Sequence, residues 1–471
     1  MRSNSAKMAF KTKIVIDKTA AIYYNIIEKN IIGAAMKRDI LDKLVSWKNS
    51  ADRKPLVLKG VRQCGKTFIL KEFGEKHYSD VAYYNFEEMA SLADIFERDF
   101  DVQRILFELG LVRGKTIAEG ATLIIFDEIQ ECGRALTSLK YFCENARGYH
   151  IACAGSLLGI ALNENRSFPV GKVDFLTLYP MSFYEFLAAT GNESSAEYLA
   201  KFEKGNKLPE ALALKLSSSF KEYLLVGGMP EAVEAWRTTH DIEKVETIQQ
   251  QILSSYELDF AKHATSREFP KLSAIWASIP QQLSKPNRKF IFSQVKKGWR
   301  AKDLEDSLRW LIAAGLIYKV DKIEKPFIPL SSYADASTFK IYLSDVGLLR
   351  RLAKVPPQVV LESSGIFTEF KGAMAENYVL NELIKSGGDA PYYWSSANSA
   401  EVDFIVQCGV HVVPVEVKSS TNVKARSLAE YRRRYAPDYS VKTSLLPDVG
   451  GETLLDIPLY MIASMRNFAG E

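Results

Sequence analysis

One glycine-rich segment contains the residue types that bind a phosphate group. Its residues are Gly60, Val61, Arg62, Gln63, Cys64, Gly65, Lys66 and Thr67, followed by Phe68. The order fits G-x-x-x-x-G-K-[ST], the phosphate-binding loop or P-loop. Glycines let the backbone curl until successive N–H groups point at phosphate oxygens. Lys66 can then reach the β- and γ-phosphates of ATP and the Thr67 hydroxyl can bind Mg²⁺, so we predict a Mg-ATP site from Gly60 to Phe68.

Two adjacent carboxylates follow about 60 residues later. Residues 123–126 are a continuous apolar run, which predicts a strand buried on both faces, and Asp127 and Glu128 come directly after it. The strand would deliver Asp127 to its C-terminal end, where this residue can hold Mg²⁺ beside Thr67. Glu128 would then polarise the attacking water as a general base. Together with the loop, the acidic pair predicts hydrolysis of ATP.

Alternating strands and helices are expected to position these residues. A strand at 56–58 precedes the loop, and a helical pattern at 68–73 follows it. Further strands are predicted at 81–86, 123–126 and 149–154, with helices at 95–109 and 136–145. An amphipathic segment at 37–47 predicts another helix packed on the same domain. Alternation of this kind predicts a parallel sheet with helices on both faces.

The middle of the chain has a different pattern. Helical spacing dominates residues 182–189, 211–225 and 242–260, interrupted by a tight turn at Gly227-Gly228-Met229-Pro230. Helices at 272–283 and 302–314 and a strand at 315–320 then suggest a winged helix. Basic residues cluster there around Trp299, namely Lys285, Arg288, Lys289, Lys296, Lys297, Arg300 and Lys302. We favour contact with nucleic acid phosphates, although Asp303, Glu305 and Asp306 partly offset this charge and winged helices also contact proteins.

Composition excludes several classes of protein. The chain has 471 residues and a net charge of +4, so its charge alone indicates no nucleic-acid partner. Five cysteines without paired spacing argue against a disulfide framework or a zinc site, and favour reduced thiols in a cytoplasm. The longest nearly apolar run, residues 151–162, is too short to span a bilayer, and the N-terminus has no signal-peptide pattern. We therefore expect a cytoplasmic protein without a membrane partner.

The C-terminal region holds a second set of charged residues. Residues 401–406 and 412–418 alternate as strands, and Glu416 and Lys418 share one face of the second strand. A two-residue hairpin loop at Cys408-Gly409 would pair Asp403 with Pro414. Glu416 would then lie diagonally from Asp403 on the same face.

The first half of the chain resembles AAA-type ATPases that pair G-x-R-Q-x-G-K-T with D-E-I-Q, here residues 60–67 and 127–130. Residues 180–183, 227–230 and 343–348 resemble the same family. The resemblance implies a polar sensor after the strand ending at Ala154, a role open to Ser156, although Gly155-Ser156 could equally be a plain turn. Where related members carry Gly-Arg, this chain has Gly171-Lys172, and Arg166 lies nearby, so no arginine finger is assigned.

The C-terminal residues resemble the restriction-endonuclease-like nuclease core. The pattern is Asp-x(12)-Glu-x-Lys from Asp403 to Lys418, preceded by a helix that carries Glu376. The resemblance implies that Asp403, Glu416 and Glu376 bind Mg²⁺ and that Lys418 stabilises the phosphate in the transition state. A polar sheet face, or a nuclease fold without activity, remains the alternative.

These observations predict an α/β protein in several parts. We expect an N-terminal extension (1–35), an AAA-type P-loop core (36–190), a helical lid (191–269), a winged-helix-like module (270–355) and a restriction-endonuclease-like domain (356–471). The function expected is Mg²⁺-dependent ATP hydrolysis coupled to a nuclease-like domain that contacts DNA or RNA. The sequence is also compatible with an oligomer. The alternative is a slow nucleotide switch whose C-terminal domain binds a partner without cleavage. A remodelling ATPase lacks support, because no pore loop stands out.

Overall fold

The computed structural model describes residues 36–155, 169–361, 368–387, 389–396, 400–419, 425–447 and 449–468. Residues Met1–Arg38 and Asp39–Glu471 are separate units, and the elements below lie in the second. Within the described ranges, no helix combines the length and the apolar character needed to cross a membrane.

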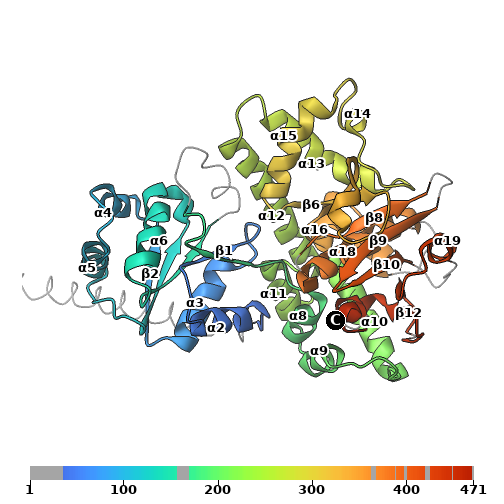
Figure 1. Ribbon diagram of the computed structural model, residues 1–471, viewed down its shortest axis with the longest axis horizontal. Helices are drawn as coiled ribbons and strands as arrows, with labels where there is room; N and C mark the ends of the chain where they lie inside the picture. Colours follow the sequence, from blue (N-terminus) through green and yellow to red (C-terminus); the bar gives the residue numbers. More distant parts are fainter. Residues whose placement is uncertain are drawn as a thin grey trace, which may run out of the picture. The chain divides into compact units, whose positions relative to one another are not determined.

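A five-stranded parallel sheet organises the first part of the chain (Figure 1). In spatial order its strands are β2 (Asp80–Asn85), β3 (Thr122–Asp127), β4 (His150–Ala154), β1 (Leu56–Lys59) and β5 (Asp174–Thr177). Every pairing is parallel. β3 is buried along its whole length, as its continuous apolar run predicts for a strand covered on both faces, and β4 is buried in the same way. The predicted α/β parallel sheet is confirmed.

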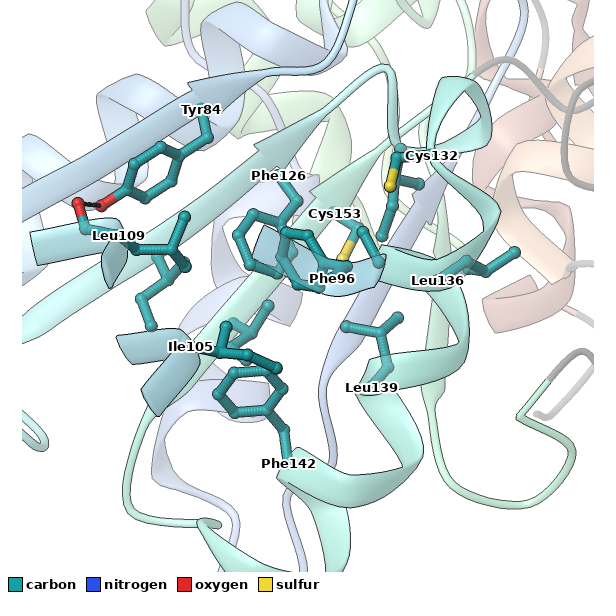
Figure 2. Packing of buried hydrophobic residues seen from close by; sticks show 14 of the residues in the cluster. Tyr84, Phe96, Ile105, Leu109, Phe126, Cys132, Leu136, Leu139, Phe142 and Cys153 are labelled. Carbon is teal, nitrogen blue, oxygen red and sulfur yellow. Dashed lines mark hydrogen bonds between the residues drawn. The ribbon is translucent and has the colours of Figure 1, made fainter. Parts of the chain in front are cut away.

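Alternate side chains of these strands pack against helices on opposite faces. On one face, Phe126 and Cys153 meet α4 (Ala93–Glu97), α5 (Val102–Arg113) and α6 (Gly133–Asn145) (Figure 2). The Tyr84 hydroxyl donates to the Leu109 carbonyl at 2.8 Å, which ties β2 to α5. Each large apolar side chain buried there contributes about 2 kcal/mol by leaving water. This packing fixes the sheet edge from which Asp127 projects.

The opposite face is covered by α3 (Lys66–His77), the helix that follows the P-loop. Phe73 of α3 meets Trp47 of α2 (Ile40–Asn49), with ring centroids 6.4 Å apart. The helix predicted at 37–47 is thereby confirmed, and it packs on the P-loop helix.

The single helix predicted at 95–109 is wrong, because two helices occupy this stretch. α4 ends at Glu97 and α5 starts at Val102. Between them the Asp99 carboxylate accepts a hydrogen bond from the Asp101 backbone N–H (2.9 Å), and the Asp101 carboxylate caps α5 by accepting from Arg104 (2.8 Å). Short acidic side chains compete in this way with helical backbone bonds, and helical periodicity alone does not detect it.

Helices dominate the next part of the chain, as predicted. They are α8 (Phe183–Ala189), α9 (Glu193–Ala200), α10 (Glu210–Val226), α11 (Pro230–Thr239) and α12 (Ile242–His263). Ser182 and Glu185 form a reciprocal capping box at the start of α8. The tight turn predicted at 227–230 separates α10 from α11.

A seven-stranded sheet organises the last part. In order its strands are β12 (Leu454–Pro458), β11 (Ser440–Ser444), β10 (His411–Val417), β9 (Glu401–Cys408), β8 (Tyr392–Ser395), β6 (Ile317–Ile323) and β7 (Ala334–Leu343). The associated helices are α13 (Phe269–Leu283), α14 (Phe292–Val295), α15 (Ala301–Ala313), α16 (Val346–Leu352), α17 (Pro357–Leu361), α18 (Thr368–Gly387), α19 (Arg426–Tyr435) and α20 (Met465–Phe468). β6 pairs with β8, so the β6–β7 hairpin continues the C-terminal sheet.

The predicted register of the β9–β10 hairpin is wrong by two residues. Pro414 pairs with Ile405 and His411 with Cys408, so the loop is Gly409-Val410. Gly409 has a φ of +55°, which glycine adopts at little cost at the first position of such a loop. Continuing the pairing brings Asp403 directly opposite Glu416. Because a shift of two residues keeps the same face, these side chains are neighbours as expected.

Candidate nucleotide site and C-terminal carboxylate cluster

The P-loop connects β1 to α3 through a backbone that requires glycine. Gly65 has a φ of +93°, in the left-handed region. A Cβ at Gly60 would lie 2.3 Å from the Leu178 carbonyl oxygen, closer than real contacts allow. The loop therefore ends at the N-terminus of a 12-residue helix, where unpaired N–H groups and the helix dipole attract anions.

Lys66 is folded back onto its own loop. Its ammonium group donates to the carbonyl oxygens of Gly60 (3.0 Å) and Val61 (2.9 Å). Both acceptors are neutral, whereas phosphate oxygens carry charge and form stronger bonds with an ammonium. The arrangement therefore fits a lysine positioned to bind a triphosphate.

Thr67 and Asp127 meet although their strands are not neighbours. β4 lies between β1 and β3, yet the Thr67 hydroxyl donates to Asp127 Oδ2 at 2.8 Å. Asp127 is only 3% exposed. A hydroxyl and a buried carboxylate in contact are the oxygen ligands that Mg²⁺ uses beside a nucleotide. The two residues therefore fit the ion predicted for them.

Glu128 occupies a backbone conformation that is uncommon for its residue type. Its φ is +49°, and its backbone N–H donates to Asp127 Oδ1 at 3.1 Å. The Gln130 side-chain amide donates to Glu128 Oε2 at 2.5 Å. A strained residue whose carboxylate is held by a neighbour is typical of a catalytic position.

Tyr83 is a site residue that the sequence prediction missed. Its hydroxyl donates to the same Asp127 Oδ2 that binds Thr67, at 2.7 Å. Burial and this bond to Asp127 raise the pKa of the Tyr83 phenol well above its usual value, so the hydroxyl keeps its proton. The signal available was a tyrosine within the strand predicted at 81–86, whose neighbours in the sheet the sequence does not specify.

Tyr83→Phe should raise the Mg²⁺ concentration needed for half-maximal ATP hydrolysis by about 5-fold, because losing one bond of about 1 kcal/mol loosens the Asp127 carboxylate. Steady-state ATP turnover measured across a Mg²⁺ titration checks this. Tyr84→Phe is the matched control, since the Tyr84 hydroxyl binds Leu109 instead. Equal Mg²⁺ dependence in both variants would refute the role of Tyr83.

α12 contacts the outer side of the loop. The Tyr256 hydroxyl donates to the Arg62 carbonyl at 3.0 Å, and Arg62 forms an ion pair with Asp259. The Ser255 hydroxyl lies 3.3 Å from the Gln63 side-chain oxygen and donates to it. The helix predicted as part of a lid therefore contacts the variable positions of the P-loop.

The remaining residues that the sequence analysis considered for the nucleotide site lie in different surroundings. Ser156, the sensor candidate, and Arg166 lie outside the described residues. Lys172 forms an ion pair with Glu144 at 2.8 Å. Cys64 is fully buried, and the Phe68 side chain is 47% exposed beside Thr67. All five cysteines are buried.

Residues 180–183, 227–230 and 343–348, which resemble the AAA-type family, contact one another around the buried Asp345 side chain. We call this contact the Asp345 joint. The Gly228 N–H donates to Asp345 Oδ2 at 2.6 Å, and the Gly228 carbonyl accepts from the Met181 N–H at 2.7 Å. A Cβ at Gly347 would lie 2.5 Å from the Val226 carbonyl oxygen. Burial raises the pKa of the Asp345 carboxyl, opposed by the backbone N–H bonds that it accepts. Segments 180–183, 227–230 and 343–348 thus have a shared structural role.

The predicted carboxylates of the C-terminal domain lie close together. Glu376 of α18 is 3% exposed, Asp403 of β9 is 8% exposed and Glu416 of β10 is 4% exposed. We name these three residues the carboxylate cluster. Asp403 Oδ2 accepts the Val417 N–H at 2.8 Å, and the Lys418 ammonium donates to Glu416 Oε1 at 2.5 Å. The structure therefore brings together the residues that the resemblance singles out.

Cations from the preceding module also reach the cluster. Arg288 forms an ion pair with Glu376, whose other oxygen accepts the Tyr342 hydroxyl at 3.1 Å. Burial raises the pKa of Glu376 to about 7, against the lowering effect of Arg288. Burial and nearby Asp403 raise the pKa of Glu416 to about 8.

Glu376 and Glu416 are thus already paired with protein cations. Among the residues that the structure describes, no group of three or more His, Cys, Asp or Glu side chains is arranged to hold a metal ion. As folded, the carboxylate cluster does not fit Mg²⁺.

The basic stretch around Trp299 is only partly directed at solvent. Lys296, Lys297, Arg300 and Lys302 are exposed, whereas Arg288 turns inward to Glu376. Lys296 also lies over the Trp299 ring, 4.9 Å from its centroid. The surface available to a phosphate backbone is therefore smaller than the sequence suggests.

Comparisons with known proteins assign part of the chain. Residues 52–187 match the family model of an AAA domain, and residues 217–359 and 371–459 match two domains of unknown function, DUF8612 and DUF4143. A search of curated proteins found no match.

Solved structures similar to this chain include the following three proteins. The Walker-type ATPase PABY2304 of Pyrococcus abyssi is 14% identical, with 67% of this chain and 95% of that chain covered and a TM-score of 0.43. Cdc6p of Pyrobaculum aerophilum is 13% identical (69% and 97% covered, TM-score 0.25). The Thermotoga maritima RuvB Holliday junction branch migration motor is 13% identical (60% and 89% covered, TM-score 0.26). Because all three TM-scores are below 0.5, we infer nothing about this chain from these three proteins.

The family match coincides with the geometry of the loop. Residues 52–187 include the P-loop, Asp127 and Glu128 on a parallel sheet, with Thr67 and Asp127 in contact. This chain therefore contains an AAA-type P-loop ATPase domain.

Proposed function

We propose that the chain binds and hydrolyses Mg-ATP and uses this cycle to control a nuclease-like, nucleic-acid-associated C-terminal domain. The observation that carries the proposal is the contact between the Thr67 hydroxyl and the buried Asp127 carboxylate, beside a P-loop lysine that donates to two neutral carbonyls. These are the groups that phosphoryl transfer requires in such domains.

Each residue has a defined task in hydrolysis. Lys66 leaves the loop carbonyls and binds the β- and γ-phosphates, while loop N–H groups hold the remaining oxygens. Thr67 and Asp127 would hold the metal ion, and Tyr83 orients Asp127. Bound Mg²⁺ would neutralise charge on the phosphates. Glu128 accepts the proton of the attacking water, whose oxygen forms the new bond to phosphorus as the bond to ADP breaks.

The C-terminal part of the proposal is supported by two observations. Glu376, Asp403 and Glu416 converge with Lys418, the set expected from the resemblance to a nuclease core. Lys296, Lys297, Arg300 and Lys302 form an exposed basic surface in the preceding module, suited to phosphate contacts.

A second function, a nucleotide switch whose C-terminal domain binds a partner without cleavage, is favoured by the ion pair between Arg288 and Glu376. A carboxylate neutralised by a protein cation is not available to a metal ion. ATP occupancy would then control binding rather than cleavage.

One assay separates the two functions. The purified chain is incubated with ATP, Mg²⁺ or EDTA, and a panel of single- and double-stranded DNA and RNA. The first function predicts steady ATP turnover that is lost in EDTA, with Mg²⁺-dependent cleavage lost in Asp403→Ala and Lys418→Ala. Tight ATP binding with negligible turnover and no cleavage of any substrate would overturn it in favour of the switch.

A further inference from the structure

A single arginine reaches the carboxylate cluster from outside the C-terminal domain. Arg288 lies in the loop between α13 and α14, in the part of the chain predicted as a winged helix. Its φ is +47°, a left-handed conformation that costs a non-glycine residue about 1 kcal/mol. The guanidinium pairs with Glu376, and the Arg288 side chain is 15% exposed. The loop therefore accepts strain in the conformation that buries this cation.

α18 is shaped to receive the guanidinium. Gly372 lies four residues before Glu376, on the same face of the helix. A Cβ at Gly372 would lie 2.7 Å from the terminal nitrogen of Arg288. That nitrogen is the end of a flexible side chain, so an added Cβ would shift the guanidinium rather than the helix. Gly372 and Glu376 together form a seat for Arg288.

The second cation is supplied by β7. Lys340 is completely buried and forms an ion pair with Glu401 at 2.6 Å, beside the Tyr393 ring. Tyr342, two residues further on the same strand, donates to Glu376. The Asn377 amide holds α18 beside β7 by bonding both backbone groups of Leu343, at 2.8 and 3.0 Å. Lys340 is therefore part of the packed interior.

One carboxylate oxygen of the cluster still lacks a donor. Glu416 Oε2 is buried and has no hydrogen-bond partner among the described residues, although Oε1 binds Lys418. Leaving a buried polar oxygen without a partner costs free energy. Four carboxylates, of Glu376, Glu401, Asp403 and Glu416, influence three cations, of Arg288, Lys340 and Lys418. Without Arg288, only the two cations of Lys340 and Lys418 would face these four carboxyl groups.

We infer that Arg288 is a built-in cation that takes the place of a divalent metal ion in the carboxylate cluster, and that the cluster becomes a divalent-cation site when Arg288 leaves its seat. The inference rests on the proposed nuclease-like cluster and specifies its regulation. Arg288 acts by occupying the site and is not a catalytic residue.

Mn²⁺ binding tests the inference without relying on activity. Free Mn²⁺ is titrated against the full chain without nucleotide and followed by electron paramagnetic resonance. Arg288→Gln should bind one Mn²⁺ at least 10-fold more tightly than the wild type, and the double variant Arg288→Gln/Asp403→Asn should lose this gain. Lys289→Gln, which removes the adjacent charge from the same loop, should behave as wild type.

Two results would overturn the inference. One is a folded Arg288→Gln that binds Mn²⁺ no more tightly than Lys289→Gln. The other is a wild type that already binds Mn²⁺ at the cluster, shown by loss of that binding in Asp403→Asn. Should Arg288→Gln not fold, Gly372→Ala displaces the guanidinium by filling its seat and should also raise Mn²⁺ affinity. An unchanged Mn²⁺ affinity in folded Gly372→Ala would contradict the claim that the guanidinium beside Gly372 excludes the metal ion.

Failure of the proposed nuclease function would look different. Nucleic acid cleavage is measured in the same samples as Mn²⁺ binding. A gain of Mn²⁺ binding without cleavage in any variant would refute the nuclease function and leave the role of Arg288 supported. ATP turnover in the same samples, expected to equal that of the wild type, verifies that the P-loop domain is intact.

Discussion

Glu128→Gln should lower the rate constant for ATP hydrolysis by about 10²- to 10³-fold while leaving ATP binding within about 2-fold of the wild type. Glutamine keeps the size of the side chain and can still hydrogen-bond Gln130, but it cannot accept a proton from the attacking water at neutral pH. Phosphate release in single-turnover experiments measures hydrolysis, and titration with a fluorescent ATP analogue measures binding.

The matched control for Glu128 is a carboxylate three residues away. Glu131 ends the short helix that follows the acidic pair and is exposed, so Glu131→Gln should hydrolyse ATP at the wild-type rate. A Glu128→Gln protein with more than a tenth of the wild-type rate would show that another group activates the water. Equal losses in both variants would indicate a general electrostatic effect rather than a base.

Gly228→Ala should destabilise the protein by about 3 kcal/mol, a large effect for a single methyl group. The new Cβ would lie 2.2 Å from the Met181 carbonyl oxygen and 2.7 Å from the Met181 nitrogen. Both are backbone atoms of a segment that pairs with Gly228, so neither can move without breaking the bonds to Asp345 or Met181. Urea unfolding followed by fluorescence measures the change in the free energy of unfolding.

Gly450→Ala is the control for Gly228→Ala. A Cβ at Gly450 meets no atom within 4 Å, and its φ is outside the left-handed region. Its stability should stay within about 0.5 kcal/mol of the wild type. If Gly228→Ala were equally stable, the three motif segments would not form the tight joint that the structure places around Asp345.

Local motifs made the nucleotide site predictable. The P-loop pattern includes the glycines that its backbone requires. A buried strand that ends in Asp127 and Glu128 places both carboxylates at the C-terminal edge of a parallel sheet. The contact between Thr67 and Asp127 follows from these two facts, although β4 lies between their strands. Tyr83 was missed because its role depends on which strand neighbours β3, and strand order is not a local property of the sequence.

The C-terminal cluster was only partly predictable. Alternation along β9 and β10 placed Asp403 and Glu416 on one face, but the loop residues that set the register could not be chosen by pattern alone. Arg288 was assigned to a basic surface, because nothing in its sequence neighbourhood points to Glu376, 88 residues later. The Asp345 joint likewise depends on contacts between segments more than 100 residues apart.

The central claim is that the P-loop holds a triphosphate through Lys66. The most direct measurement is ATP affinity in the presence of Mg²⁺, by isothermal titration calorimetry, for the wild type, Lys66→Ala and the exposed-position control Lys297→Ala. The account predicts saturable 1:1 binding by the wild type and the control, and affinity at least 100-fold weaker for Lys66→Ala. A wild type that does not bind ATP, or a folded Lys66→Ala that binds it with unchanged affinity, would contradict the account.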